Sequence, residues 1–242
     1  MEPFAAKRIW LERAADGASL KSSSGAVVKV DHHLLGHPRR GSDLLWRAVL
    51  AGPGRVVDAT AGLGSDAFHL AAKGARVTMI ERSPMLAELL ADAIERARAG
   101  QWGEAAQRSA QRLDLVVGDS REVLVSGALG GDVAVVFLDP MFPQRGKGAL
   151  PAKGIALLRQ LLARPDEEPA AGPQEAAGVG LAAKAVEEAE LLAAAISGAL
   201  RRVVVKRPVR AGPLAGVRPS GELRGSTTRY DLYPGGAGEV SR

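Results

Sequence analysis

The chain has 242 residues, of which 46% are hydrophobic and 24% are charged, and its formal net charge is +5. This composition is typical of a globular protein with one α/β domain and a small appendage. Because the chain has no cysteine, disulfides, thiolate zinc sites and cysteine nucleophiles are excluded. We expect a cytoplasmic protein, since neither a signal peptide nor an apolar run of the roughly 20 residues that span a membrane is evident.

The first 54 residues are predicted to form an N-terminal segment of short elements ahead of the main domain. Residues 25–31 alternate between apolar and polar side chains, which is typical of a short strand. Residues 41–52 have apolar side chains at helical spacing, and Ser42 or Asp43 is suited to cap that helix. The remainder of the segment is predicted to be irregular.

Strands and helices alternate in the central part of the chain. The pattern predicts strands at 55–59, 75–81, 112–120 and 132–140, and helices at 65–74 and 83–100. Such alternation favours a mostly parallel sheet with helices on both faces. In sheets of this kind, ligands bind beyond the carboxyl ends of the strands, so the residues that follow each strand are the candidates for a site.

The C-terminal third is predicted to complete the same domain. It contains an insertion at about 164–183 that is rich in Pro, Gly, Ala and acidic residues, a helix at 181–200, a strand at 201–208 and one or two antiparallel strands within 221–236. The main domain is therefore expected to span 55–234, and residues 235–242 are expected to form a tail.

The ends of the first two predicted strands carry residues suited to a nucleoside ligand. Asp58 lies near the end of the first strand, and Gly62 and Gly64 permit a tight turn whose backbone a ligand can approach closely. Glu81 ends the second strand, where a carboxylate can accept hydrogen bonds from both hydroxyls of an adenosine ribose.

The end of the third predicted strand and the first glycine turn narrow the choice of ligand. Asp119, with Ser120 beside it, is suited to accept a hydrogen bond from an adenine amino group. Ser65 and Asp66 follow Gly64 in place of the rest of a dinucleotide-binding motif. An acid there would repel a pyrophosphate and attract a sulfonium, which favours S-adenosylmethionine over NAD.

The fourth predicted strand ends in a turn that is suited to hold an amino group. Asp139 follows the apolar run, and Pro140 removes a backbone donor and stiffens the turn. The Asp139 carboxylate and the Pro140 carbonyl could accept the two N–H groups of an exocyclic amine, and Phe142 could stack on its base. The amine lone pair would then point at the methyl group, and this alignment is the main catalytic requirement.

These motifs resemble those of a known family. Asp-Pro-Met-Phe resembles the (D/N)-P-P-(Y/F) motif of amino-group methyltransferases that act on DNA, RNA or protein glutamine. The strings "VVDATAGLGSDAFHLAAKGARVTMIERSP", "VVFLDPMFP" and "RRVVVKRP" resemble the RsmJ family of bacterial methyltransferases, from about Val56 to Tyr233 outside the insertion. The resemblance implies a seven-stranded Rossmann-like class I fold and methyl transfer from S-adenosylmethionine to the N2 amine of a guanosine near the 3′ end of 16S ribosomal RNA.

Site residues follow from the same resemblance. Carried over by motif, the methyl donor would contact Ser65, Asp66, Glu81, Arg82, Asp119, Ser120 and Asp139. Ribosomal RNA or the 30S particle would be the partner, with contacts expected from the basic residues Arg39, Arg40, Arg145, Lys147, Lys206 and Arg207. For Arg207, pairing with an acid at the end of the sheet is the alternative.

Several alternatives stay open at this point. The chain could be an amino-group methyltransferase with DNA, another RNA or a protein as its substrate. It could also be a non-catalytic module that binds nucleic acid through its basic face, and an NAD oxidoreductase is disfavoured by Asp66. We expect no metal site, because no pair among the four histidines has ligand spacing with acids nearby.

Overall fold

The computed structural model describes residues 8–37, 43–50, 54–140 and 175–236. Seven strands form the main sheet: β4 (Arg55–Asp58), β5 (Val77–Glu81), β6 (Leu113–Val117), β7 (Val133–Leu138), β8 (Arg202–Pro208), β9 (Gly221–Arg224) and β10 (Thr228–Pro234). The larger helices are α3 (Ser65–Ala72), α4 (Pro84–Arg98), α5 (Gly103–Ala110) and α8 (Glu175–Gly198). Shorter helices are α1 (His33–Gly36), α2 (Leu44–Val49), α6 (Ser120–Val125) and the 3-10 turn η1 (Leu214–Gly216).

The main sheet has the order β6-β5-β4-β7-β8-β10-β9. Neighbouring strands from β6 to β8 are parallel, whereas β10 is antiparallel to both β8 and β9. The strand order reverses at β4, where β5 lies on one side and β7 on the other, as expected for a doubly wound sheet. These observations confirm the α/β fold class, the seven-stranded sheet and the antiparallel C-terminal pair.

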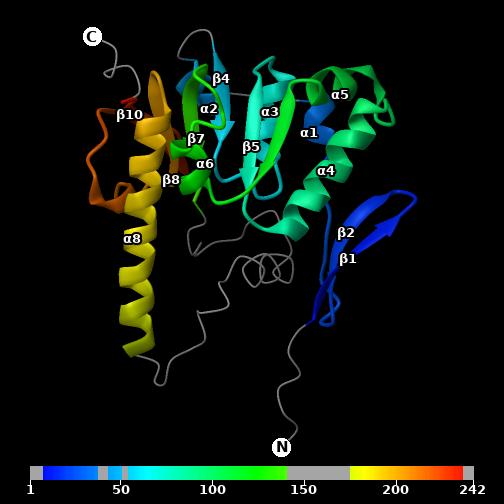
Figure 1. The fold of residues 1–242 in the computed structure, drawn as a ribbon, viewed down its shortest axis with the longest axis horizontal. Helices are drawn as coiled ribbons and strands as arrows, with labels where there is room; N and C mark the ends of the chain where they lie inside the picture. The colour runs from blue at the N-terminus through cyan, green and yellow to red at the C-terminus, as the bar shows by residue number, and fades with distance from the viewer. Residues whose placement is uncertain (1–7, 38–42, 51–53, 141–174, 237–242) are drawn as a thin grey trace, which may run out of the picture.

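Helices cover both faces of the sheet (Figure 1). One face packs on α3, α4 and α5 through buried side chains that include Val56, Phe137 and Val204. The other face packs on α6 and α8 through Val57, Leu138 and their neighbours. Side chains alternate between the two faces along each strand, and both faces are apolar because both are covered.

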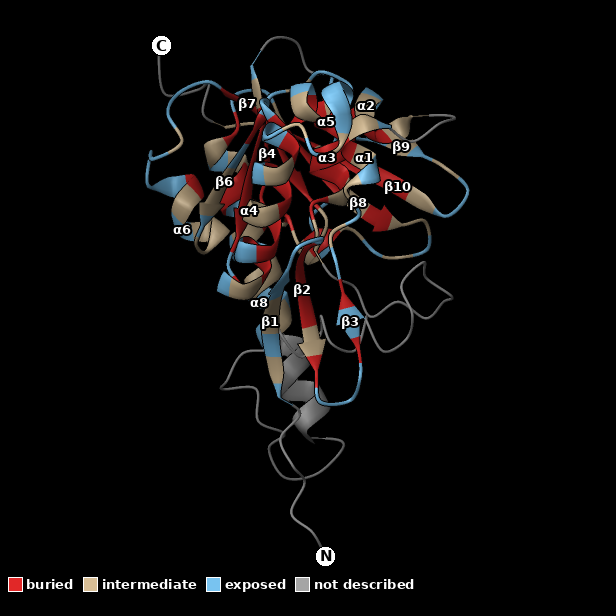
Figure 2. Cartoon of the chain, turned by 90° about the vertical axis from the view of Figure 1, so that its right-hand side faces the viewer, coloured by how far each residue is buried: buried red, intermediate tan, exposed pale blue. Residues whose placement is uncertain are grey.

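The N-terminal segment forms a second, three-stranded sheet of β1 (Ile9–Ala14), β2 (Gly17–Ser22) and β3 (Val27–Val28). It projects from the main body beside α4 (Figures 1 and 2). Leu20 of β2 is fully buried and belongs to one apolar cluster with Leu86 and Leu89 of α4. The expected strand at 25–31 is thus reduced to two residues, and the β1–β2 hairpin was missed by the sequence pattern.

The long helix α8 begins at Glu175, within the segment at about 164–183 that we expected to be an insertion. Its C-terminal turns pack on the sheet through Leu192 and Ala195. Helices α5 and α6 were not predicted. Among the helices that the structure describes, none is long and apolar enough to cross a membrane.

Candidate active site

The carboxyl ends of three adjacent strands bring ionisable residues together on the α3 face of the sheet. Val56, Phe137 and Val204 all pack in the cluster on that face. Because side chains alternate along a strand, the residues two positions further on lie on the same face. These residues are Asp58 at the end of β4, Asp139 after β7 and Lys206 in β8.

Lys206 lies between two of the carboxylates. Its Nζ donates to Oδ2 of Asp66 at 2.6 Å and to Oδ2 of Asp139 at 2.7 Å. Asp66 lies in the first turn of α3 and its side chain is 8% exposed, whereas that of Asp139 is 36% exposed. Burial favours the neutral amine of Lys206, but the two carboxylates outweigh it and raise the pKa of Lys206 above its ordinary value.

Asp58 is the most buried acid of this group, at 2% exposure. Burial, with added repulsion from Asp66 and Asp139, raises the pKa of Asp58 to about 8, although its Oδ1 accepts a hydrogen bond from the Thr60 amide at 3.1 Å. Asp58 is therefore largely protonated at neutral pH. Within the group formed by Asp66, Asp139 and Lys206, two carboxylates thus share one ammonium.

The turn after β4 has the backbone geometry that its glycines permit. Gly62 and Gly64 have φ values of 54° and 75°, in the left-handed region that favours glycine. A Cβ at Gly64 would lie 2.8 Å from side-chain atoms of both Leu90 and Phe68. Any other residue at Gly64 would therefore meet steric conflict as well as backbone strain.

Glu81 connects this turn to the end of β5. Its Oε2 accepts from the Gly62 amide at 2.9 Å and its Oε1 accepts from the Ser83 amide at 2.8 Å. The residue is 4% exposed, and burial raises the pKa of Glu81 against these hydrogen bonds. Both carboxylate oxygens are thus held in fixed directions, and each retains a further lone pair. The neighbouring Arg82 is exposed.

The end of β6 is closed by an ion pair. Asp119 caps α6 and accepts from the Arg121 side chain at 2.6 and 3.0 Å, which holds the pKa of Asp119 below its ordinary value. Ser120 Oγ donates to the Ala59 carbonyl at 2.5 Å and so ties the start of α6 to the end of β4. The role of Arg121 was not predicted, although its position two residues after Asp119 is a signal of local pairing.

Lys206 and Arg207, which we predicted as a joint RNA contact, lie on opposite faces of β8. Arg207 donates through Nε and Nη2 to the Gly212 carbonyl at 2.9 and 2.6 Å. Both cations therefore have partners within the protein, and the two described partners of Lys206 are acids of the site.

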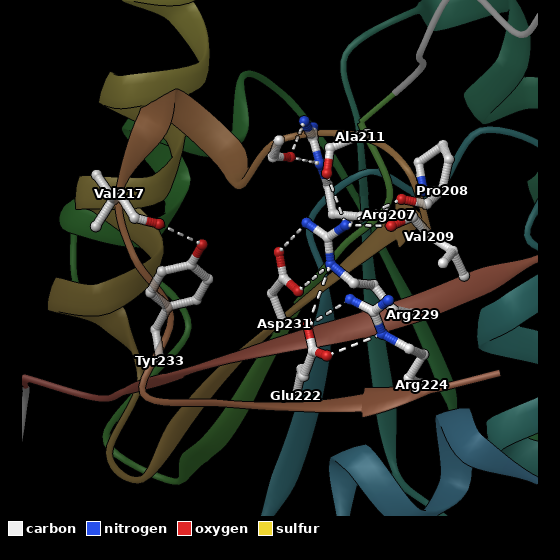
Figure 3. Close-up of polar contacts among 11 residues, drawn as sticks. Arg207, Pro208, Val209, Ala211, Val217, Glu222, Arg224, Arg229, Asp231 and Tyr233 are labelled. Carbon is white, nitrogen blue, oxygen red and sulfur yellow. Dashed lines mark hydrogen bonds and ion pairs between the residues drawn. The ribbon is translucent and has the colours of Figure 1, made fainter.

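The connection that follows β8 is held in place by Arg229 (Figure 3). Arg229 Nη1 donates to the carbonyls of Pro208, Val209 and Ala211 at 3.2, 2.9 and 2.6 Å. Its Nε and Nη2 donate to the fully buried Asp231 at 2.7 and 3.1 Å. The loop at the rim of the site is thus fixed by a buried ion pair.

The remaining predicted site residues lie outside the described part of the chain: Phe142, Arg39, Arg40, Arg145 and Lys147. Pro140 is described and half-buried. Thr60 was missed, although its Oγ1 accepts from the Asp139 amide at 2.6 Å and so joins the ends of β4 and β7. Within the described residues, no group of three or more His, Cys, Asp or Glu could hold a metal ion.

Comparison with known proteins identifies the family. A family model described as "Putative SAM-dependent methyltransferase" matches residues 28–171 and 179–235, which is most of the chain. The chain belongs to this family. Its cofactor is S-adenosylmethionine.

Two relatives of this chain share a name. Proteins named ribosomal RNA small subunit methyltransferase J, from Thioalkalivibrio sulfidiphilus and Alkalilimnicola ehrlichii, are 43% and 38% identical over 74% and 98% of this chain. The matches span 61% and 87% of those two relatives. A crystal structure of an S-adenosylmethionine-dependent methyltransferase from Neisseria gonorrhoeae is 30% identical, has a TM-score of 0.73, and matches over 100% of this chain and 89% of its own.

The carboxyl edge of the sheet fits the family's cofactor in two respects. The excess negative charge of the Asp66–Asp139–Lys206 group is complementary to a sulfonium cation. The fixed Glu81 carboxylate stands at the end of the second strand of the fold, where hydroxyl groups of a ribose can donate to it.

Proposed function

We propose that this protein transfers a methyl group from S-adenosylmethionine to the N2 amine of a guanosine near the 3′ end of 16S ribosomal RNA. The observation that carries the proposal is the position of Asp139. This residue begins the turn after β7, which is predicted to bind an amine, and it connects that turn to the glycine turn after β4, which is proposed to bind the cofactor. Its amide donates to Thr60, and its carboxylate shares Lys206 with Asp66. The name shared by the relatives supports the choice of RNA over DNA or protein.

Residues at four strand ends are proposed to hold the cofactor. Glu81 would accept from the ribose hydroxyls, with Arg82 beside it, and the backbone at Gly62, Gly64 and Ser65 would approach the methionine part. Asp119 and Ser120 would lie at the adenine. Asp66 and Asp139 would face the sulfonium, with Asp58 behind them as a largely neutral acid.

The turn after β7 is proposed to hold the substrate amine. The carboxylate of Asp139 and the carbonyl of Pro140 would accept its two N–H groups, which directs the nitrogen lone pair toward the cofactor. When bound, the cofactor supplies an electrophilic methyl group on sulfur. Asp139 and Pro140 would hold the amine nitrogen in line with that methyl group, and the methylated amine would lose one proton to solvent. Phe142 is proposed to stack on the base.

Phosphate contacts are proposed for the basic residues outside the described part of the chain: Arg39, Arg40, Arg145 and Lys147. Arg207 is not among them, because its side chain is buried and donates to the Gly212 carbonyl. RNA binding through such contacts weakens as salt concentration rises, and loss of one contact lowers the slope of that dependence by about one.

Labelling of RNA tests this function. Radiolabelled S-adenosylmethionine is incubated with wild-type protein and with 16S RNA or 30S particles from cells that lack it, and the methylated nucleotide is located by mass spectrometry. We expect one N2-methylguanosine near the 3′ end. Absence of label in any RNA, with cofactor binding demonstrated by calorimetry, would contradict the proposal.

The matched variant is Asp139→Asn, which preserves the volume of the side chain and removes its charge. We expect at least about a hundredfold loss of methyl transfer, within the range for groups that position a reacting atom. Label on DNA or on a protein with none on RNA would instead establish the amino-group methyltransferase with another substrate. Failure to bind the cofactor at all would favour the non-catalytic module.

A further inference from the structure

We propose that Lys206 is a positioning residue of the reaction centre, whose ammonium keeps the Asp139 carboxylate ionised and directed toward the substrate amine. This inference rests on the proposed function, and it gives Lys206 a different role from the phosphate contact predicted from the sequence. The two ion pairs of 2.6 and 2.7 Å carry the argument.

The fold determines which direction Lys206 faces. Leu138 pairs with Val205 in the parallel ladder between β7 and β8, so Asp139 and Lys206 follow as adjacent positions at the strand ends. Lys206 shares the α3 face with Val204, and Asp66 lies in the first turn of α3. The ammonium therefore lies between the helix that begins at the cofactor turn and the turn that holds the substrate.

Rotation of Lys206 toward RNA would take its ammonium away from the carboxylates of both Asp66 and Asp139. Asp58, Asp66 and Asp139 meet here from β4, α3 and the end of β7, and Lys206 from β8 pairs with two of them. Arg207 faces the other side of the sheet, toward Gly212. Glu81 is tied to Gly62 and Ser83. An opposite charge favours the ionised form of a carboxylate, whereas neighbouring carboxylates and burial disfavour it.

Asp58 shows what happens to an acid of this group that lacks such a partner within hydrogen-bond distance. It is close to the same carboxylates and is buried, and its pKa rises to about 8. Asp139, held by Lys206, would keep its charge and its acceptor capacity at neutral pH. A protonated Asp139 would present one acceptor fewer to the amine and would no longer attract the sulfonium.

The test compares Lys206→Met and Lys206→Arg with the wild type in single-turnover methyl transfer at saturating RNA and cofactor, from pH 5.5 to 9. Lys29→Met is the matched control, because Lys29 forms an exposed ion pair with Asp16 in the N-terminal sheet. We expect the acid limb of the Lys206→Met profile to move up by about 1–3 pH units, the usual effect of one neighbouring opposite charge. Lys206→Arg keeps the positive charge, so the acid limb of its pH–rate profile should stay near that of the wild type. Its maximal rate should be lower, because the geometry of the ion pairs is altered.

A second measurement does not depend on activity. The side-chain carboxyl of Asp139 is followed by ¹³C NMR as pH changes, with its resonance assigned by Asp139→Asn. The pH at the midpoint of the Asp139 titration should be higher in Lys206→Met than in the wild type. It should be unchanged in Lys206→Arg and Lys29→Met. If Lys206→Met does not fold, a shifted midpoint or acid limb in Lys206→Arg would overturn the proposal.

Other outcomes would contradict the proposed role of Lys206. An equal loss of rate at every pH with an unmoved midpoint would assign Lys206 a purely structural role. In Lys206→Met, a raised KM for RNA, a weaker dependence of RNA affinity on salt concentration and an unchanged pH profile would show that Lys206 binds phosphate instead. If the wild type methylates no RNA, the proposed function fails, and the NMR titration still tests the electrostatic role of Lys206.

Discussion

The backbone amide of Gly62 donates a hydrogen bond of 2.9 Å to Oε2 of Glu81, so the end of β5 fixes the turn that follows β4. Two parts of the proposed cofactor site that are distant in sequence are therefore one structural unit. A change at Glu81 should alter both the acceptor of the ribose hydroxyls and the shape of the glycine turn.

Glu81→Gln is expected to weaken the binding of S-adenosylmethionine by about 10- to 100-fold, since hydrogen bonds to a charged group contribute about 1.5–3 kcal/mol. Isothermal calorimetry measures the change. Glu95→Gln, an exposed position on α4, is the control and should bind as the wild type does. Equal affinities of Glu81→Gln and the control for S-adenosylmethionine would show that Glu81 does not contact the cofactor.

Asp58→Asn should change how the stability of the protein depends on pH. The folded-state pKa of about 8 lies above the value of the unfolded chain, so folded protein binds more protons than unfolded protein between about pH 4 and 8. The free energy of unfolding of the wild type therefore falls across this range because of Asp58. Asp58→Asn lacks this loss. Its free energy of unfolding relative to that of the wild type should therefore increase by more than about 1 kcal/mol from pH 5 to pH 8.5.

Urea unfolding of both proteins at the two pH values measures that difference. The asparagine can still accept the hydrogen bond from the Thr60 amide. A constant difference between variant and wild type would show that Asp58 is ionised in the folded protein.

Gly64→Ala and Gly62→Ala form a matched pair at two positions of positive φ. A Cβ at Gly62 would have its nearest neighbour at 3.9 Å, whereas at Gly64 it would meet Leu90 and Phe68 at 2.8 Å. Left-handed backbone costs about 1 kcal/mol for alanine, and crowding adds about 1–3 kcal/mol at Gly64. Thermal or urea unfolding should rank Gly64→Ala as the less stable variant, and the reverse order would contradict the packing of this turn.

Arg229→Met should destabilise the fold by about 3–5 kcal/mol, because it leaves the fully buried Asp231 without its main partner and frees three carbonyls. Arg224→Met is the comparison, since Arg224 pairs with Glu222 at the exposed edge and should cost less than about 1 kcal/mol. Urea unfolding measures both. In the double variant Arg229→Met with Asp231→Leu, much of the lost stability should return, unless the carbonyl contacts rather than the ion pair dominate.

The sequence predicted the central part of the fold well because β4, β5 and β7 are buried almost throughout and each strand is followed by a turn or helix signal. The acids at the strand ends were found because the carboxyl ends of parallel strands all lie at one edge of the sheet. The partnership of Lys206 could not be found, because Asp66 and Asp139 lie 140 and 67 residues away and the pairing depends on which face of β8 the lysine occupies.

The N-terminal hairpin was missed although a signal for it exists. Asp16 and Gly17 lie between β1 and the rest of β2, and an Asp-Gly pair between alternating segments is typical of a hairpin turn. β1 is only partly buried, and β2 packs on α4 rather than in the main core and contains small and polar residues at most positions, so the apolar pattern is weak when it is considered alone.

That packing sets a limit on how far the chain can be shortened. A protein cut to begin at β4 would keep every strand of the main sheet, yet Leu86 and Leu89 would lose the cover that Leu20 and its neighbours give them. These leucines lie in the first two turns of the helix that follows Glu81. Truncation would thus expose an apolar surface next to Glu81, the proposed ribose contact, where self-association would compete with binding of the cofactor.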